Sequence, residues 1–418
     1  MTSRLNTEYR ALNLFAVACG LALWLPAVGV PVWQVRLQPM DLLALVALPL
    51  IVVFRKYLAP EIFIGVTLLI AAFSMSTWVG GSVTVLLYYL GFILPFILGL
   101  YIILRVRAAQ RWFLSAFLLG GVLSCLFFLT QIVFGAENLD FRNNSFFRMP
   151  PHFGRGFALF PEVSTFAAHA VIVLGVLLSL MFRPHNKAAN RHFILVLLCL
   201  ILVSLMFTRS TSFLLIAPLL VGFVVFRTNR LSLNSALTTV FIVILATAVL
   251  SYFLSIFYAD RLLTSSAERS AAMRLASILG GLSPLTSGEI FGVGLGNNEL
   301  VRGRAFNAAR ALGLVHGRLP DGINSLVVGR IFEEGWPAVL QQCFAIILLA
   351  RAAVLRRLSG GEAALITLAL GSFLVSLFVT GYRGIYTNWM WLAIAPAILA
   401  NHKHQLLQNR QTLLWAAH

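Results

Sequence analysis

Long apolar stretches, repeated along nearly the whole chain, limit its fold more than any other feature. Most are about 20 residues long, the length that an α-helix needs to cross a hydrocarbon core of about 30 Å. The chain of 418 residues is 60% hydrophobic and only 11% charged, whereas soluble domains carry roughly 25% charged residues. Because a bilayer leaves no water for unpaired backbone groups, such segments must be helical. The sequence therefore predicts an all-α polytopic integral membrane protein.

We expect about twelve transmembrane helices in one membrane domain that covers residues 1–418. The candidate spans are 11–33, 41–54, 61–79, 82–104, 112–134, 157–182, 193–207, 211–226, 236–258, 324–350, 362–380 and 385–400. No internal repeat or low-complexity linker divides the sequence. One long polar loop, residues 259–323, separates the ninth and tenth spans and is expected to carry part of a functional site.

Basic residues are distributed unevenly between the two sides of the predicted bundle. With the N-terminus inside, the tails and the even-numbered connections hold most of them, including every lysine, Lys56, Lys187 and Lys403. This asymmetry follows the positive-inside rule, so we expect both termini in the cytoplasm and the long loop in the periplasm. Topology and lipid headgroups account for much of the net charge of +17. No nucleic-acid partner is therefore expected.

Arginines on the predicted outer side break the positive-inside pattern. They lie in the connection near 135–156 and in the long loop, and they are Arg142, Arg148, Arg155, Arg261, Arg269, Arg274, Arg302, Arg304, Arg310 and Arg318. A guanidinium group binds phosphate or carboxylate with two parallel hydrogen bonds, which an ammonium group cannot do. The alternative is that these arginines solvate the loop or pair with the outer acids, Glu268, Glu289, Glu299 and Asp321.

The first motif precedes the sixth span. Arg155-Gly156 is followed by Phe157, then by Pro161-Glu162 at the expected helix start. A carboxylate at the end of a membrane span is costly unless it is paired or functional. Glu162 is therefore a candidate catalytic residue, with helix capping as the alternative.

Two further motifs contain arginine. Arg209 lies in the tight turn 208–212 between the seventh and eighth spans, where it faces either a functional cavity or the lipid headgroups. Arg274 precedes a glycine run, 292–297, that no strand introduces, so the run is not a dinucleotide-binding fingerprint. We expect its glycines, Gly294 and Gly296 among them, to let the backbone approach a ligand and its amides to form an anion-binding nest.

A fourth motif starts the tenth span with Asn324-Ser325 and continues to Glu333-Glu334-Gly335. In this order, the four motifs resemble those of the O-antigen polymerase and O-antigen ligase superfamily of bacterial membrane glycosyltransferases. The resemblance covers roughly residues 150–340 and the general twelve-helix, GT-C-like layout. Ligases of that superfamily often carry histidine before the Asn-Ser pair, where this chain has Ile323, and this departure favours a polymerase.

The resemblance implies a metal-independent polysaccharide polymerase that acts at the periplasmic face of the bacterial inner membrane. Its substrate would be a glycan linked to undecaprenyl pyrophosphate, transferred onto another lipid-linked repeat unit. Arginine would stabilise the departing pyrophosphate without a metal ion. The implied catalytic residues are Glu162, Arg155, Arg209 and Arg274. The implied substrate-binding residues are Arg318, Asp321, Asn324, Glu334, Gly294 and Gly296, with Asp321 and Glu334 as alternative bases.

Neither a cofactor nor a metal site is expected, since no His, Asp or Glu cluster has ligand spacing and the four cysteines lie in apolar segments. Membrane lipid is an expected partner, together with a chain-length regulator and a flippase. Two alternatives remain at this point. A ligase would transfer the glycan to a lipid or protein acceptor with the same arginines. A flippase would place polar groups at mid-bilayer, whereas here the span centres are nearly free of charge.

Overall fold

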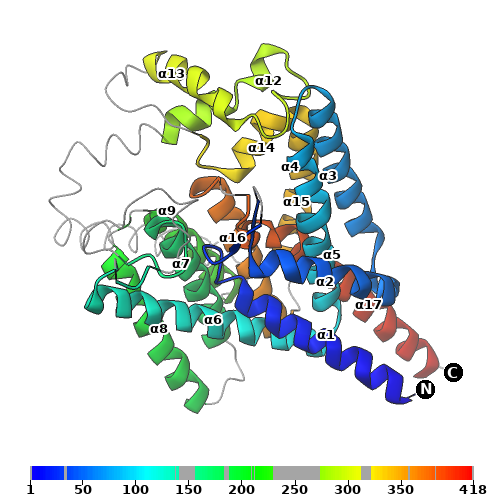
Figure 1. Ribbon diagram of the computed structural model, residues 1–418. Helices are drawn as coiled ribbons and strands as arrows, with labels where there is room; N and C mark the ends of the chain where they lie inside the picture. The colour runs from blue at the N-terminus through cyan, green and yellow to red at the C-terminus, as the bar shows by residue number, and fades with distance from the viewer. Residues whose placement is uncertain are drawn as a thin grey trace.

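The computed structural model is helical almost throughout (Figure 1). It describes residues 2–32, 35–136, 138–140, 156–182, 188–208, 210, 212–228, 274–311, 322–355, 358–381 and 383–416. Within these residues, one pair of strands forms a short antiparallel hairpin in which Val30 pairs with Leu37 and Val32 with Val35. The prediction of an all-α membrane protein is confirmed at this level.

The N-terminal half contains nine of the described helices and the hairpin. In chain order they are α1 (Thr2–Ala22), β1 (Val30–Val32), β2 (Val35–Leu37), α2 (Pro39–Val53), α3 (Pro60–Trp78), α4 (Val83–Tyr88), α5 (Leu94–Arg105), α6 (Arg107–Phe134), α7 (Val163–Met181), α8 (Ala188–Thr208) and α9 (Ser212–Thr228). A 3-10 turn, η1 (Arg55–Tyr57), follows α2. A π-helical turn, η2 (Tyr89–Ile93), joins α4 to α5.

The C-terminal half alternates short and long helices. They are α12 (Pro284–Ser287), η3 (Asn298–Leu300), α13 (Val301–Ala311), α14 (Leu326–Glu334), α15 (Trp336–Ala353), α16 (Gly360–Phe378), η4 (Tyr386–Trp389) and α17 (Met390–Ala416). Residues 274–281 form a further helical segment ahead of α12. Both termini lie at the end of the molecule opposite to α12 and α13 (Figure 1).

Seven helices in the described part of the chain are long and apolar enough to cross a membrane. They are Pro60–Trp78, Val83–Arg105, Arg107–Phe134, Val163–Met181, Arg191–Thr208, Trp336–Ala353 and Gly360–Phe378. Each overlaps one of the predicted spans. The predicted spans at 41–54 and 211–226 are shorter apolar helices. Those at 11–33 and 385–400 overlap α1 and α17. The span at 236–258 lies outside the described residues. The count of twelve is therefore not confirmed.

The predicted span 324–350 is not one helix, and this corrects the sequence analysis. It breaks at Gly335, whose φ of 64° and ψ of −141° end α14 and begin α15. The next residues, Trp336 and Pro337, occupy the first turn of α15, where proline is tolerated because its missing N–H has no helical partner. A Cβ at Gly335 would lie 2.2 Å from the carbonyl oxygen of Ile290. Because Gly335 has no side chain, the segment that contains Ile290 can contact the backbone at this break.

Helices α1 and α6 pack along each other at very short range. A Cβ at Gly20 would lie 2.8 Å from the carbonyl oxygen of Phe113, and one at Gly120 would lie 2.4 Å from Cδ1 of Trp24. The Trp24 indole also donates to the carbonyl of Phe117 at 2.8 Å. Small residues at such crossings favour van der Waals contact between membrane helices, since lipid tails supply no hydrophobic driving force.

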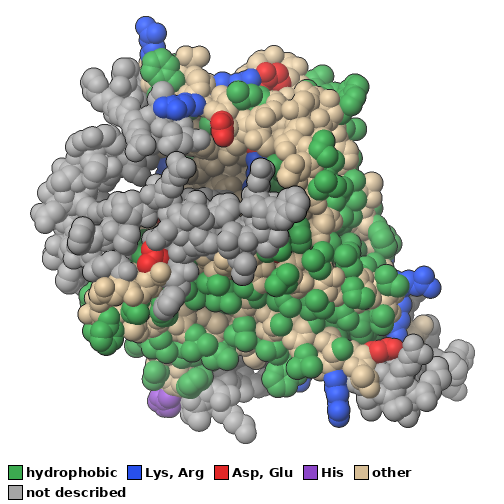
Figure 2. Space-filling model, in the orientation of Figure 1, with side chains coloured by type: hydrophobic (Ala, Val, Ile, Leu, Met, Phe, Trp, Pro, Cys, Tyr) green, Lys and Arg blue, Asp and Glu red, His purple; other side chains and the backbone are tan. Residues whose placement is uncertain are grey.

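Helices α7 and α16 form the centre of the bundle. They pack against each other, and they are the most buried of the seven spans. Around them, hydrophobic side chains cover a broad band of the molecule, and most visible Lys and Arg side chains lie beyond this band at either end (Figure 2). This distribution is the one expected of a protein whose middle contacts lipid tails.

Residues 274–311 and 322–335 form a compact unit at one end of the bundle, which we call the cap (Figure 1). Its small core contains Val301, Ile323, Val328 and Phe332, with Ile278, Leu282 and Val293 packed against them. Most of the cap was predicted to be a long polar loop. The described part of that predicted loop folds against α14, the C-terminal end of α3 and the N-terminal end of α4.

The α1–α6 contact can be tested with Gly120→Ala. The added methyl group has to displace the Trp24 ring, so we expect a loss of about 1–3 kcal/mol in the free energy of unfolding, as for other overpacked sites. Gly303→Ala is the matched control, because no atom lies within 4 Å of its added Cβ in α13, and we expect a gain of about 0.5–1 kcal/mol. Thermal unfolding in detergent measures both, and an unchanged midpoint for Gly120→Ala would contradict the close crossing.

Candidate active site between the bundle and the cap

The turn that precedes α7 is fixed by one glutamine. The Gln131 Oε1 atom accepts hydrogen bonds from the amides of Phe157 and Ala158 at 2.9 and 2.7 Å. Its Nε2 atom donates to the carbonyl of Ala158 at 3.2 Å. Ala158 has a φ of 52°, which non-glycine residues rarely adopt, and a Cβ at Gly156 would meet the Phe128 ring at 2.9 Å. The motif around Gly156 thus has a local structural reason, namely to hold the start of α7.

Glu162 lies at the N-cap position of α7 but makes no capping hydrogen bond. Its Oε2 atom accepts instead from the hydroxyl of Ser164 at 3.0 Å. The side chain is half-buried. The capping alternative therefore does not describe the geometry, and the carboxylate lies at the end of the most buried span.

Arg274 is the first described residue of the cap and is half-buried. Burial lowers the pKa of its guanidinium, and the negative charge of Glu162 opposes this change. An arginine remains protonated under either influence. Two predicted catalytic residues from segments far apart in the sequence are thus close enough to interact electrostatically.

The glycine run approaches protein backbone. The amides of Val293 and Gly294 donate to the carbonyls of Phe332 and Glu333 at 3.0 and 3.1 Å. Gly292, Gly294 and Gly296 all have positive φ, which glycine adopts without steric cost. These two amides are hydrogen-bonded to the protein, so the predicted anion-binding nest does not form at them, and the run instead binds to α14 within the cap.

Glu334 lies in a fully paired, buried ion pair. Its two carboxylate oxygens accept from Nε and Nη2 of Arg330 at 3.0 and 2.7 Å, and Arg330 also donates to Gln341 at 2.6 Å. The two side chains are 4% and 0% exposed. The Arg330 guanidinium lies 5.3 Å from the ring centre of Phe73 and 5.6 Å from that of Trp389. This geometry indicates a structural role for Glu334, and its predicted contact with substrate stays a prediction.

The neighbouring carboxylate, Glu333, pairs with Arg383 from the loop between α16 and η4. The Glu333 side chain is 1% exposed, whereas Arg383 is 20% exposed. The Glu333 carbonyl oxygen also accepts from the Ser76 hydroxyl at 2.5 Å. The sequence analysis assigned no role to Arg383. The Arg-x-x-x-Glu spacing of 330 and 334 was the one signal of this cluster, since residues four apart share a helix face.

At the start of α14, one predicted site residue is exposed and its two neighbours are buried. Asn324 is exposed, whereas Ser325 caps the helix by accepting from the amide of Val328 at 3.2 Å. Ile323, at the position where histidine would favour a ligase, is 3% exposed and belongs to the core of the cap. Four predicted site residues, Arg155, Arg209, Arg318 and Asp321, lie outside the described residues, so their roles stay predictions.

On the cap surface, Arg304 and Glu289 form a two-point ion pair with distances of 2.5 and 2.7 Å. The Arg304 guanidinium lies 5.3 Å from the ring centre of Phe332 and also donates to Ser283. Hydrogen bonds from Arg304 lower the pKa of Glu289. For this arginine, the alternative that loop arginines pair with outer acids is confirmed.

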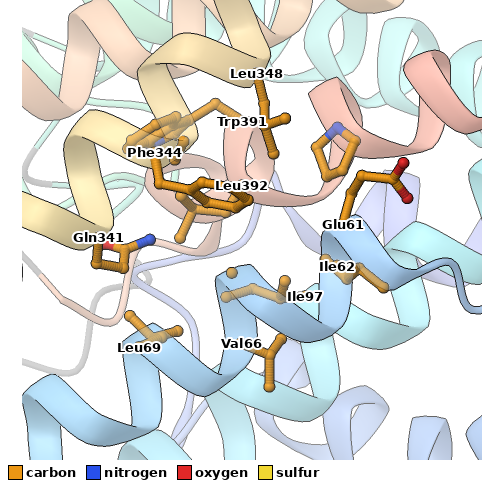
Figure 3. Close-up of a pocket in the computed structure, with 13 residues that line it drawn as sticks. Glu61, Ile62, Val66, Leu69, Ile97, Gln341, Phe344, Leu348, Trp391 and Leu392 are labelled. Atoms are coloured by element: carbon orange, nitrogen blue, oxygen red, sulfur yellow. The ribbon is translucent and has the colours of Figure 1, made fainter.

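A small apolar groove, with a cavity volume of ≈ 20 Å³, opens between α3, α5, α15 and α17 (Figure 3). Phe344, Leu348 and Trp391 lie along it, with Gln341 and Glu61 at opposite sides of the view. Gln341 is the residue that binds Arg330, so the groove reaches the buried ion pairs from the apolar flank. It brings together no set of charged groups suited to chemistry. Among the residues that the structure describes, no three His, Cys, Asp or Glu side chains are placed to hold a metal ion.

The fold and the site together define a polytopic helical membrane protein with paired charges at the junction of its bundle and cap. No protein-family model matches the chain, and no curated protein matches it either. The family resemblance noted in the sequence therefore remains a basis for proposals.

Glu334→Gln tests whether Glu334 is structural. The change leaves the buried Arg330 charge uncompensated, so we expect a loss of about 3–5 kcal/mol in the free energy of unfolding. Combining it with Arg330→Met should restore part of that loss, because the unpaired charge is removed. Thermal unfolding of the single and double variants measures this. A stable but inactive Glu334→Gln protein would instead support the predicted role as a base.

The cap ion pair predicts a pH dependence. The pKa of Glu289 is lowered in the folded protein, so its stabilisation is present above the unfolded value of about 4.3 and is lost as pH falls through the folded value. Both groups are about one-third exposed, so we expect Glu289→Gln to cost at most about 1 kcal/mol at neutral pH. The difference from the unchanged protein should vanish in acid. Glu299→Gln, at an exposed carboxylate, is the control and should show no such convergence.

Proposed function

We propose that this protein is a glycosyltransferase that polymerises polysaccharide at the outer face of the bacterial inner membrane. It joins a polyprenyl-pyrophosphate-linked glycan to another lipid-linked repeat unit, as in O-antigen, capsule or exopolysaccharide synthesis. The observation that carries this proposal is the electrostatic interaction between Glu162 and Arg274, through which the carboxylate opposes the lowering of the guanidinium pKa. It supplies a carboxylate for proton transfer and a guanidinium for a phosphate group, and each belongs to a different motif of the superfamily that the sequence resembles.

The reaction needs three events at one place. The acceptor hydroxyl oxygen bonds to the anomeric carbon, the bond from that carbon to the diphosphate oxygen breaks, and its electron pair leaves with the diphosphate. The hydroxyl proton passes to the Glu162 carboxylate, which acts as a general base. The guanidinium of Arg274 stabilises the charge that develops on the departing diphosphate. Arg155 and Arg209 are proposed to complete this anion site.

Two observations favour a polymerase over the alternatives. Ile323 is a core residue, so this position offers no histidine of the kind that ligases of the superfamily often carry. The buried ion pairs Arg330–Glu334 and Arg383–Glu333 lie outside the seven long apolar spans, whereas a flippase is expected to place polar groups at mid-bilayer.

Deletion of the gene tests the reaction class. We expect single repeat units and no ladder when surface or secreted polysaccharide is separated by gel electrophoresis. Long chains that remain unattached to their acceptor would instead indicate a ligase, and lipid-linked units trapped in the cytoplasm would indicate a flippase. Sidedness is tested with cysteine at position 302, which is exposed on the cap. A membrane-impermeant maleimide should label it from outside, and labelling only after lysis would contradict the proposed face.

Site variants test the residues. We expect Arg274→Lys to reduce polymerisation about 10²-fold or more, because the charge stays but the two-point contact with phosphate is lost. Glu162→Gln should reduce it by about 10²- to 10⁴-fold through loss of the base. Arg302→Lys, on the exposed face of α13, is the matched control and should retain activity. Assays with purified lipid-linked repeat units measure these rates, and full activity of both site variants at normal protein level would exclude the assigned roles.

A further inference from the structure

The loop of residues 379–389, of which all but 382 are described, lies between several parts of the candidate site. A Cβ at Gly381 would lie 1.9 Å from the carbonyl oxygen of Ile323, and the Thr380 carbonyl accepts from the amide of Leu326 at 3.0 Å. The loop therefore touches the start of α14 on both sides of the exposed Asn324.

The same loop is tied to α7. The Thr387 hydroxyl contacts Nε2 of His169, whose Nδ1 lies 2.6 Å from the carbonyl oxygen of Thr165. His169 is fully buried, two helical turns beyond Glu162 in the same helix. The loop thus contacts both α7 and the cap, and we call it the floor loop.

Arg383 is held in this loop through its backbone and its side chain. The Trp389 indole donates to the Arg383 carbonyl at 2.9 Å. The guanidinium pairs through Nη2 with Glu333 and lies 5.9 Å from the ring centre of Tyr89. An arginine fixed in this way loses little further side-chain entropy when it binds a ligand.

The two arginines of the buried cluster, Arg330 and Arg383, differ in how many of their N–H groups already donate hydrogen bonds within the protein. Arg330 bonds both oxygens of Glu334 and also Gln341, and it is 4% exposed. Arg383 pairs with one carboxylate through one terminal nitrogen and is 20% exposed. Its other N–H groups make no hydrogen bond to the described part of the chain. A guanidinium carries five N–H donors, so one edge of Arg383 can bind an oxyanion while the other stays paired with Glu333.

The geometry points to Arg383 as an additional binding residue for a diphosphate group, with Glu333 as the residue that positions it. The inference rests on the proposed function, since it deepens the anion site that Arg274 begins. The ligand class is an organic diphosphate, which is either the lipid-linked donor or the diphosphate released from it.

Binding to the full-length protein in nanodiscs tests this, with farnesyl diphosphate and inorganic pyrophosphate as probes. Arg383→Lys is expected to weaken binding of both probes about tenfold or more, because it keeps the charge and loses the planar fork. Arg302→Lys should leave binding within about twofold. Tighter binding of farnesyl diphosphate than of pyrophosphate supports the lipid-linked source, and equal or weaker binding overturns that source.

The outcomes separate the two proposals. If Arg383→Lys binds normally while Arg274→Lys loses binding, the inference fails and the proposed function stands. If the unchanged protein binds neither probe, both fail. A measurement on the unchanged protein avoids dependence on the variant's folding. Farnesyl diphosphate should slow phenylglyoxal modification of Arg383, read by mass spectrometry, and equal modification with and without the probe overturns the inference.

Discussion

The cost of burying charge in an apolar bundle is the constraint on which the rest of this structure depends. An unpaired ion in such surroundings costs several kcal/mol, and pairing recovers that cost only when hydrogen bonds satisfy the remaining donors and acceptors. At the end of α14, Arg330 meets this condition with Glu334 and Gln341. Rings of Phe73 and Trp389 face the same guanidinium. The cluster thereby fixes helices from both halves of the chain around one point.

The short motifs of the sequence prove to have two kinds of role. Some residues shape the backbone, as Gly156 does against Phe128 and Gly292 does against the backbone of Glu333. Others place charges at the junction of cap and bundle, as Glu162 and Arg274 do. The proposed chemistry uses the charged residues, and the residues that shape the backbone hold them in place.

The sequence predicted much of the fold, because apolar runs of about 20 residues leave little choice of structure. It missed the break at Gly335, which lies inside the predicted span 324–350, directly after Glu333 and Glu334. The succession Gly335-Trp336-Pro337 carried a usable signal, since glycine ends helices and proline is tolerated in the first turn of the next one. Pairings between distant segments, such as Glu333 with Arg383 or Gln131 with the turn at Phe157, could not be predicted. They depend on helix packing, and no spacing along the chain records them.

Glu333 takes part in two sets of contacts at once, and this has a mechanical consequence. Its carbonyl oxygen accepts from Gly294 in the cap and from Ser76 at the end of α3, while its carboxylate pairs with Arg383 in the floor loop. One residue therefore connects the glycine run of the cap, the end of α3 and the floor loop. A displacement of the cap is therefore expected to shift the Arg383 guanidinium as well, because Glu333 holds both.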